Sequence, residues 1–404
     1  MSAAGTPRYV TLSRAAKAGT PLVLVGPGPL SVAWMHPEEQ VDAVGLGVAG
    51  EGIGPLCRIG EAPPVAPPGP FFGGWAFDAA RPWKGFAAER WVLPEVLGHW
   101  DGQRTWLSAF GPQGTSEAEL AARLDEVEEV AIPALQPSAR RLPEDPSPFH
   151  ALVAQALEEL EQGRTRKLVV ARSIEVEADA PWSERQVLAS LVARFPSCRT
   201  FLLRGSDGSA FLGASPELLC EVRGALVRAE ALAGTAAPGK GARLLSSAKD
   251  RREHETVAAH VRAVLGRFVS ELRMPDEPGL RQLANVVHLH TPAEGLLRAG
   301  ASAFDLSRAL HPTPAVAGVP IAGALEWLRQ KEGFARGWYA GVVGAAGPDA
   351  VVLAVALRSA LLHQTRASVF VGAGVVEGST PRGEWLETER KARALLPALG
   401  VHHG

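Results

Sequence analysis

Three charged side chains near the C-terminus have the spacing of a ligand site. We expect a helix that begins at the Ser-Thr-Pro turn of residues 379–381, with the serine or threonine as N-cap and the proline in the first turn. In that helix Glu384, Glu387 and Lys391 fall at i, i+3 and i+7, within roughly 60° of arc on one face. A carboxylate beside a buried face needs a partner, because an unpaired buried charge is costly. Glu387 and Lys391 are also spaced as an ordinary solvated i,i+4 ion pair, and this helix alone leaves that alternative open.

A second predicted helix, over residues 247–272, also carries a carboxylate beside its apolar stripe. Glu253 lies about 60° from the centre of the stripe, which consists of Val257, Val261, Val264 and Phe268. A single glutamate in this position is often a surface residue, but two such helices suggest carboxylates that converge on a cation. Oxygen ligands without a cysteine or histidine cluster favour Mg²⁺ over zinc. Because Mg²⁺ binds one or two carboxylates, waters and an anionic ligand, the pattern implies an acidic substrate.

Further candidates lie at strand ends and in glycine-rich turns. Lys167 opens a predicted strand over residues 167–178, where it is either a solvated lysine or, with a lowered pKa, a general base. Glu217 follows a Gly-Ala-Ser-Pro turn between two strands and points either into a cleft, as a general acid, or into water. The predicted loop 232–235 and the glycine turn 372–374, which interrupts a strand predicted over residues 367–376, offer backbone N–H groups suited to a carboxylate.

Composition excludes several classes of protein. The chain has 404 residues, of which 46% are hydrophobic and 21% charged, as in an ordinary globular protein. Its 41 basic and 43 acidic residues give a net charge of -2 without blocks of one sign, so neither nucleic acid nor an anionic membrane is expected as a partner. Three cysteines without a CxxC pair argue against disulfides and a zinc site. With no secretory signal and no apolar run long enough for a bilayer, we expect a cytoplasmic, soluble protein.

The organisation of the chain changes near residue 145. Residues 1–145 are rich in glycine and proline, with short predicted strands, and residues 140–148 read as a linker. In residues 71–78, FFGGWAFD, two glycines among aromatics predict a strand that another backbone approaches closely. Beyond the linker we expect a helix with Ser147 as N-cap, another with a Ser183 to Gln186 capping box, and four short strands in hairpin spacing. They are predicted at residues 200–203, 209–213, 218–222 and 225–229, and a later strand at 283–290 leads into a predicted TPAEG loop.

Ten motifs in fixed order resemble the chorismate-utilising enzymes. From Phe149 to the C-terminus they read KLVVAR, FLGASPELL, EALAGT, SAKDRREHE, VVHLHTPAEG, HPTPAVAG, YAGVVG, ALRSA, VFVGAGVV and GEWLETERK. Within that family the chain is most similar to the isochorismate synthases. The resemblance implies an α+β fold of two large antiparallel sheets packed face to face with helices outside. It also implies that residues 1–145 add strands to that fold and that residues 146–404 form the chorismate-binding catalytic region.

The resemblance assigns a role to each candidate. Glu253 and Glu387 match the ligands of Mg²⁺, which also binds the ring carboxylate of chorismate, and Glu384 would support the metal through water. Lys167 matches the base that activates water, and Glu217 matches the acid that protonates the departing hydroxyl. The positions around the ring and the two substrate carboxylates are matched by Gly234, Thr235, His288, Ala315, Arg358, Gly372 and Lys391.

Two positions narrow the expected reaction. Lys167 favours water as the nucleophile, because the amine-forming relatives lack this lysine and take ammonia from a glutaminase, so no glutaminase subunit is expected. Ala315 stands where relatives that eliminate pyruvate tend to have threonine, which favours release of isochorismate. We therefore expect a Mg²⁺-dependent isochorismate synthase, monomeric as is usual in the family, that serves menaquinone biosynthesis. The alternatives are a salicylate synthase and, from another class, a non-catalytic protein that binds a small acid.

Overall fold

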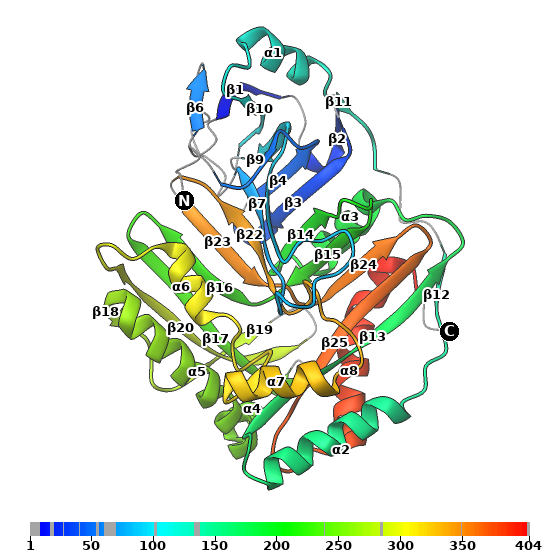
Figure 1. Cartoon of the computed structure of the whole chain (residues 1–404), viewed down its shortest axis with the longest axis vertical. Helices are drawn as coiled ribbons and strands as arrows, with labels where there is room; N and C mark the ends of the chain where they lie inside the picture. The colour runs from blue at the N-terminus through cyan, green and yellow to red at the C-terminus, as the bar shows by residue number, and fades with distance from the viewer. Residues whose placement is uncertain are drawn as a thin grey trace.

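Two large sheets form most of the molecule, and helices lie on their outer sides (Figure 1). The structure is a computed structural model. It describes residues 9–16, 20–26, 28–39, 41–53, 56–59, 70–100, 103–132, 138–237, 239–282, 286–348 and 350–401. The prediction of an α+β fold with two large antiparallel sheets is confirmed.

The larger sheet has thirteen strands within the described residues. All its strand pairs there are antiparallel except the pair of β1 and β6. In spatial order the strands are β12 (Ala139–Arg141), β13 (Lys167–Ala178), β25 (Arg366–Val375), β24 (Ser359–His363), β15 (Ala210–Ser215), β14 (Arg199–Arg204), β3 (Leu30–His36), β4 (Val41–Leu46), β9 (Val96–Trp100), β10 (Thr105–Pro112), β1 (Tyr9–Ala15) and β6 (Leu56–Ile59), with β21 (Gly318–Val319) beside β13.

The smaller sheet has ten strands in the part of the chain that the structure describes. Its order is β18 (Val269–Arg273), β20 (Val287–Leu297), β17 (Leu226–Ala236), β16 (Leu218–Arg223), β23 (Ala350–Val355), β22 (Val342–Ala346), β7 (Phe71–Trp75), β8 (Glu89–Leu93) and β5 (Gly50–Glu51), with β19 (Gly279–Gln282) also paired to β20. A short separate ribbon joins β2 (Leu24–Val25) to β11 (Glu128–Glu129).

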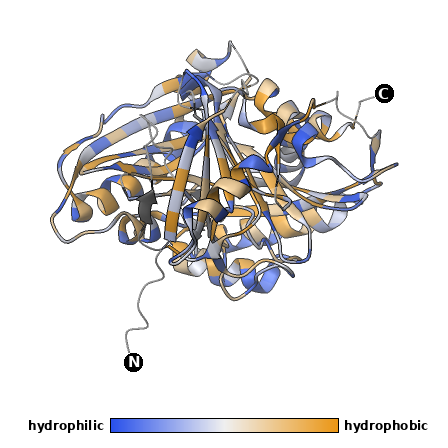
Figure 2. Ribbon diagram, turned by 90° about the horizontal axis from the view of Figure 1, so that it is seen from above, coloured by the Kyte–Doolittle hydropathy of each residue, from blue (hydrophilic) through white to orange (hydrophobic). Residues whose placement is uncertain are grey.

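Side chains from both sheets meet in one apolar core. Successive residues of a strand point to opposite faces, so Phe201 and Leu203 of β14 enter the core between the sheets, whereas Leu202 faces outward. Phe72 of β7 and Leu353 of β23 reach the same inner core from the smaller sheet. Seen from above, apolar and polar segments alternate along the strands and helices (Figure 2), as expected when each element buries one face.

Helices cover the outer faces. In Figure 1, α8 (Pro381–Leu395) runs alongside β25, and it packs on that strand and on α2 (Ser147–Glu161). The helix α5 (Ala248–Phe268) packs on β17 and β20 of the smaller sheet. The other helices are α1 (Glu117–Asp125), α3 (Glu184–Arg194), α4 (Gly241–Ser246), α6 (Ala303–Leu310) and α7 (Ile321–Lys331), with short 3₁₀ turns at Pro21–Val23, Pro37–Glu39 and Leu396–Leu399. Among the described residues no helix is long and apolar enough to span a membrane.

Strands from the first 145 residues enter both sheets. In the larger sheet β3 pairs with β14, and in the smaller sheet β7 pairs with β22. The close approach expected at residues 71–78 is present, because a Cβ on Gly73 would lie 2.0 Å from the Arg90 carbonyl oxygen and one on Gly74 would lie 1.9 Å from that of Val342. The division of the chain at residues 145 and 146 stays a prediction.

Two predicted loops and one predicted glycine turn are strand segments in the structure. Residues 232–235 belong to β17, 372–374 to β25, and the TPAEG segment, 291–295, to β20. Each runs beside a neighbouring strand, for example Gly372 opposite Ala171. The predictions were wrong because glycine and proline were taken as breaks, whereas here the glycines permit close packing. The first part of the strand predicted at 283–290 lies outside the described residues, because residues 283–285 are not among them.

Two predicted helix caps are also corrected. The Ser147 side chain does not cap α2, because the N-cap position is Pro146 and the Asp145 carboxylate accepts a hydrogen bond from Ser147 N at 2.9 Å. Ser183 is the N-cap residue of α3 but makes no side-chain capping bond. The cap predicted before α8 is confirmed at Thr380, whose hydroxyl accepts from Gly383 N at 3.1 Å.

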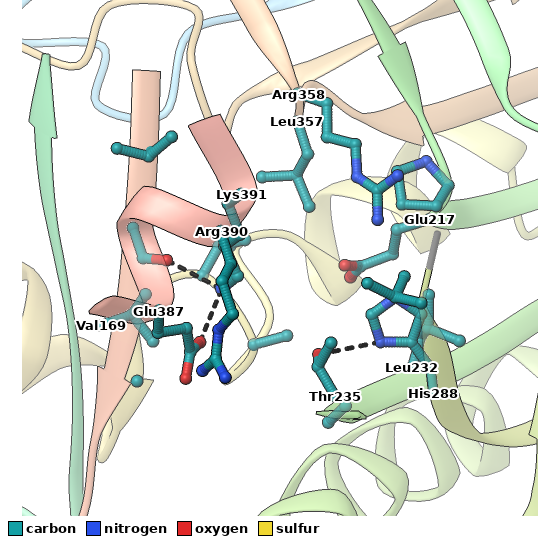
Figure 3. A pocket seen from close by; sticks show the side chains of 18 of the residues that line it. Val169, Glu217, Leu232, Thr235, His288, Leu357, Arg358, Glu387, Arg390 and Lys391 are labelled. Carbon is teal, nitrogen blue, oxygen red and sulfur yellow. Dashed lines mark hydrogen bonds and ion pairs between the residues drawn. The ribbon is translucent and has the colours of Figure 1, made fainter. Parts of the chain in front are cut away.

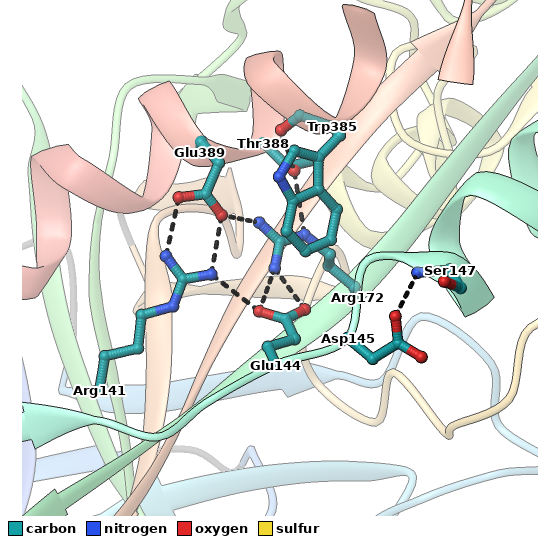
Figure 4. Close-up of polar contacts among 8 residues, drawn as sticks. All are labelled: Arg141, Glu144, Asp145, Ser147, Arg172, Trp385, Thr388 and Glu389. Atoms are coloured by element: carbon teal, nitrogen blue, oxygen red, sulfur yellow. Dashed lines mark hydrogen bonds and ion pairs between the residues drawn. The ribbon is translucent and has the colours of Figure 1, made fainter. Parts of the chain in front are cut away.

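The predicted linker, residues 140–148, holds a charged network that joins α8 to β13 (Figure 4). Glu144 binds Arg172 of β13, and Arg172 also reaches Glu389 of α8 at 2.5 Å and lies over the Trp385 ring at 3.8 Å from its centroid. Arg141 binds the same Glu389 carboxylate at 2.7 Å. The segment therefore fixes α8 to the sheet and does more than link two regions.

Candidate active site

A cavity of about 540 Å³ lies where α5 and α8 approach the ends of strands from both sheets. Most of the predicted site residues line it: Glu217, Gly234, Thr235, Glu253, His288, Ala315, Arg358, Gly372, Glu387 and Lys391. Lys167 and Glu384 are not part of the lining. Both are adjacent to it, because Lys167 contacts Glu253 and Glu384 lies one turn before Glu387.

One wall of the cavity is built from β13, β25, α5 and α8. Strand β25 runs beside β13, so that Gly374 lies opposite Val169. A Cβ on Gly374 would lie 3.1 Å from Lys167 Cε and 3.2 Å from Glu253 Oε1, and one on Gly372 would lie 2.9 Å from the Tyr339 hydroxyl. The absence of side chains at these two glycines therefore leaves room for the charged groups of this wall.

Two lysine–glutamate ion pairs occupy this wall. The Lys167 ammonium is 2.9 Å from Glu253 Oε1, and the lysine is only 3% exposed. The Lys391 ammonium is 2.8 Å from Glu387 Oε1 and donates a hydrogen bond to the Gly372 carbonyl oxygen at 2.8 Å (Figure 3). Burial opposes the charged forms of Lys391 and Glu387, but their mutual attraction prevails, so the pKa of Lys391 is raised and that of Glu387 is lowered. The i,i+4 pair considered from the sequence is thus present at the cavity wall.

Glu384 is buried behind these pairs. It is 4% exposed, and burial raises its carboxyl pKa more than a hydrogen bond with Ser379 lowers it. Within the described residues, no group of three or more His, Cys, Asp or Glu side chains lies close enough to hold a metal ion. The carboxylates that line the cavity on this side include Glu253 and Glu387, with Asp250 three residues before Glu253 on α5.

The opposite wall carries Glu217 at the turn between β15 and β16. Its backbone is fixed by hydrogen bonds, with Glu217 N donating to Ser215 Oγ at 3.2 Å and Val355 N donating to the Glu217 carbonyl oxygen at 3.1 Å. The carboxyl group faces the cavity (Figure 3) and the residue is 6% exposed. Burial, with a further contribution from the negative charge of Glu230, raises the pKa of Glu217 to about 8. A carboxyl group in this state is protonated at neutral pH and can donate a proton.

His288 and Thr235 lie beside Glu217 on the same wall. Gly234 has φ of 71° and forms the bulge where the pairing of β17 with β20 shifts. Its carbonyl oxygen and the Thr235 hydroxyl are each 3.0 Å from His288 Nδ1. Burial and the positive charge of Arg358 lower the pKa of His288 to about 4, so the ring is neutral. With Nδ1–H donating to the carbonyl oxygen, Nε2, which no described residue hydrogen-bonds, is free to accept from a ligand.

Arg358 and Ala315 complete the predicted set. Arg358, with φ of 47°, follows β23 and lines the cavity. Ala315 lines the cavity with its backbone N–H directed to Thr313 Oγ1 at 3.3 Å. The structure thus brings together cations for an anionic ligand, a protonated acid and two carboxylates.

Sequence reasoning missed several cavity residues. Tyr339, Arg336, Lys249 and Arg390 also line the cavity. Lys249 and Arg390 stand four residues before Glu253 and three after Glu387, so helical spacing from the predicted ligands could have found them. Arg336 gives no local signal, because a buried ion pair with Glu332 at 2.7 Å brings it under the cavity.

Comparisons with known proteins agree with this site. The family model described as "Chorismate binding enzyme" matches residues 60–400. A protein of Pseudomonas aeruginosa named salicylate biosynthesis isochorismate synthase is 35% identical over 92% of this chain and 85% of its own length. Isochorismate synthase EntC of Escherichia coli is 36% identical over 63% of this chain and 67% of its own. Among shorter matches, the chain spans 60% of the isochorismate synthase MenF of Pasteurella multocida.

Solved structures share the fold. MenF, the menaquinone-specific isochorismate synthase from Escherichia coli, superposes with a TM-score of 0.81 over 98% of this chain and 96% of that chain, at 23% identity. Anthranilate synthase component I from Streptococcus pneumoniae gives a TM-score of 0.69 over 83% and 82%, at 22% identity. A family match over most of the chain and a relative alignable almost from end to end leave one conclusion: this chain belongs to the chorismate binding enzymes.

Proposed function

We propose that the chain is an isochorismate synthase that converts chorismate to isochorismate with water as the nucleophile. The observation that carries the proposal is a protonated acid, Glu217, in the cavity lining, with Lys167 directly behind the facing wall, where it is paired with Glu253. Relatives named isochorismate synthase support the choice within the family. Because an isomerase of this type adds one hydroxyl and removes another, it needs both a base and an acid.

The residues divide the reaction between the two walls. Lys167, once it has given up its proton and the contact with Glu253, takes a proton from water. The resulting hydroxide adds to the ring carbon beside the one that bears the carboxylate. The ring double bonds shift and the original hydroxyl leaves as water with a proton from Glu217. The neutral His288 accepts a hydrogen bond from the substrate, while Lys391 and Arg358 neutralise its carboxylates, with backbone N–H groups near Gly234 and Gly372 and the Thr235 hydroxyl adding hydrogen bonds.

A magnesium ion fits the donor set of the charged wall. Glu253 and Glu387 supply two hard oxygen ligands on the cavity surface, Glu384 is placed to act through water, and the substrate carboxylate would complete the shell. When bound, the ion would supply electrostatic stabilisation of charge on the ring carboxylate. Both glutamates are paired with lysines in the structure, so the protein itself neutralises the site in the absence of a cation.

The assay of chorismate turnover tests the proposal. Purified protein with chorismate and Mg²⁺ should accumulate isochorismate, and chelation should stop the reaction. Accumulation of salicylate and pyruvate would instead support the second candidate, a salicylate synthase. Binding of chorismate without turnover would support a non-catalytic acid-binding protein.

Ala315 is the residue with which to examine the choice of product. The small side chain at the cavity is consistent with release of isochorismate intact. We expect Ala315→Thr to raise the fraction of salicylate by a few-fold at most, because one side chain changes the partition between two exits by only about 1 kcal/mol. Product analysis by chromatography measures this fraction.

For the cellular role we propose menaquinone biosynthesis by a monomer in the cytoplasm, without a glutaminase subunit. The menaquinone-specific enzyme that shares the fold supports this choice, whereas the Pseudomonas relative is named for salicylate biosynthesis. Loss of menaquinone on deletion of the gene would support the pathway. Light scattering of the purified protein tests the monomer, and turnover without any ammonia source tests the independence from a glutaminase.

A further inference from the structure

A buried carboxylate outside the predicted site lies directly behind the proposed acid. Glu230 is on β17, and its side chain is 7% exposed. Its carboxylate accepts hydrogen bonds from Arg281 Nη1 at 2.6 Å and 2.8 Å and from His290 Nε2 at 2.9 Å. Burial acts to raise the pKa of Glu230, but His290 and Arg281 more than compensate, so the pKa is lowered and the group is ionised. This ionised cluster has no part in the reaction described above.

The same carboxylate fixes the first residue of β16. Leu218 N, directly after Glu217, donates a hydrogen bond to Glu230 Oε1 at 2.8 Å. The pairing of β16 with β17 includes Glu221 opposite Arg228, and at that register Leu219 would stand opposite Glu230. The pairing of β16 with β23 also shifts between Leu218 and Cys220. At the irregular start of β16, the Glu230 side chain therefore binds the backbone N–H of the residue directly after Glu217.

We propose that Glu230 is a positioning residue for Glu217. It accepts the hydrogen bond from Leu218 N, and it keeps a negative charge behind the acid. The inference rests on the proposed function, in which Glu217 is the general acid. A fixed negative charge nearby favours the protonated form of a carboxyl group. It opposes the cations that act on Glu217 from the other elements, namely Lys167 on β13 and Lys391 on α8, while His288 on β20 is neutral.

Two substitutions separate the charge from the hydrogen bond. Glu230→Gln removes the charge and keeps an acceptor for Leu218 N, so the pKa of Glu217 should fall by about one pH unit. Glu230→Asp keeps the charge but is one methylene shorter, so the pKa should stay near the wild-type value while kcat falls several-fold. Glu294→Gln is the matched control, because Glu294 carries an equal charge on β20 in an exposed pair with Arg228.

The pKa of Glu217 is best measured by infrared titration, which does not depend on turnover. The band of the protonated carboxyl group that disappears in Glu217→Gln identifies the residue, and its midpoint should be lower in Glu230→Gln and unchanged in Glu294→Gln. An unchanged midpoint in Glu230→Gln would overturn the proposal even in an active enzyme. Conversely, if the midpoint of Glu217 were lowered in Glu230→Gln but the wild-type protein did not turn over chorismate, the inference about Glu230 would be retained and the proposed function rejected.

A second variant, expected to shift the midpoint of Glu217 in the opposite direction, tests the proposal if Glu230→Gln does not fold. Arg281→Gln removes the cation that compensates Glu230, so the midpoint of Glu217 should rise. If both variants moved the midpoint in the same direction, loosening of the strand would explain the result and the charge effect would be rejected.

Discussion

The two walls of the cavity differ in their charge: one holds ion pairs and the other holds neutral, hydrogen-bonded groups. The charged wall, formed by Lys167, Glu253, Glu387 and Lys391, holds opposite charges that neutralise each other in pairs. The acid wall, formed by Glu217, Thr235 and His288, holds a protonated carboxyl group and a neutral ring that neighbouring backbone groups fix in place. Figure 3 shows Glu387 and Lys391 on one side of the cavity and Glu217, Thr235 and His288 on the other.

The difference indicates which groups must move. A ligand that engages the charged wall has to replace existing ion pairs, so part of its binding free energy is offset by their loss. The acid wall needs no such exchange, because its protonation states and hydrogen bonds already suit proton donation. We therefore expect substitutions of the charged-wall carboxylates to change metal dependence, and changes on the acid wall to alter the pH profile.

The largest effect should come from Lys167→Ala. Loss of a general base typically lowers turnover by about 10²–10⁴-fold, and here it also leaves Glu253 without its lysine. Isochorismate formation and calorimetric chorismate binding in the presence of Mg²⁺ should separate, with turnover lost and binding retained. Lys331→Ala on the exposed end of α7 is the control. Turnover close to that of the control would show that Lys167 is not the base and that its ion pair with Glu253 is not needed for the reaction.

Glu387→Gln should be the next most severe change. It removes a negative oxygen ligand and the partner of Lys391, so the Mg²⁺ concentration for half-maximal activity should rise at least about tenfold. Glu377→Gln, an exposed glutamate just before α8, is the matched control. A normal Mg²⁺ dependence in Glu387→Gln would show that the charged wall does not bind the metal through this residue.

The acid wall predicts a fall in activity at alkaline pH. Glu217 acts as an acid only while protonated, and its pKa is about 8. The rate should be insensitive to this group below that value and fall about tenfold per pH unit above it. A profile of kcat/KM against pH, which reports the ionisation of the free enzyme, would contradict the assignment if kcat/KM were constant through pH 8 and beyond.

A smaller effect is expected from the network behind the charged wall. Arg172→Met should leave Glu144 and Glu389 without their shared cation and lower the free energy of unfolding by about 1–3 kcal/mol. The pKa of Glu389 is about 2, held down by its hydrogen bonds with Arg141 and Arg172 against the opposing effect of burial. Its contribution to stability is therefore present above its unfolded pKa and lost as the pH falls toward 2.

Denaturant unfolding at neutral and acid pH measures this effect. The difference between wild type and Arg172→Met should shrink as the pH is lowered. Arg366→Met, in the exposed pair with Glu177 on the same sheet, serves as a control with little expected change. An equal loss of stability in Arg172→Met and Arg366→Met would show that the network around Arg172 does not hold α8 on the sheet.

Local sequence predicted most elements of the second half of the chain, because their hydrophobic periodicity is strong. The helix from Pro381 and the strand from Lys167 occur as expected. The segment that contains Gly234 in β17 was mistaken for a loop, and the strand predicted over residues 367–376 is confirmed as β25, although Gly372 and Gly374 do not interrupt it. Only the neighbouring strands reveal why glycine is needed at these positions, and a single stretch of sequence does not identify those neighbours.

The candidate site was predictable where a charged residue stands next to an apolar stripe or strand in the local sequence. The acids and lysines of the charged wall stand out on helices and at a strand end, where helical spacing gives their direction. Glu230, Arg281 and His290 could not be found in this way, because they lie on three strands and meet only through the pairing of β17, β19 and β20. Their local sequences are those of ordinary strand residues.

The pairing of β3 with β14 and of β7 with β22 has a consequence for dividing the protein. Residues 146–404 expressed alone would carry newly open strand edges on β13 and β14 in the larger sheet and on β22 in the smaller sheet, and such edges promote aggregation. These edges are covered by backbone hydrogen bonds from residues 1–145, so the two pieces produced together form a natural pair for fragment complementation. Recovery of chorismate turnover from the co-produced pieces, and aggregation of the longer piece alone, would reveal how strongly the first region shields the second.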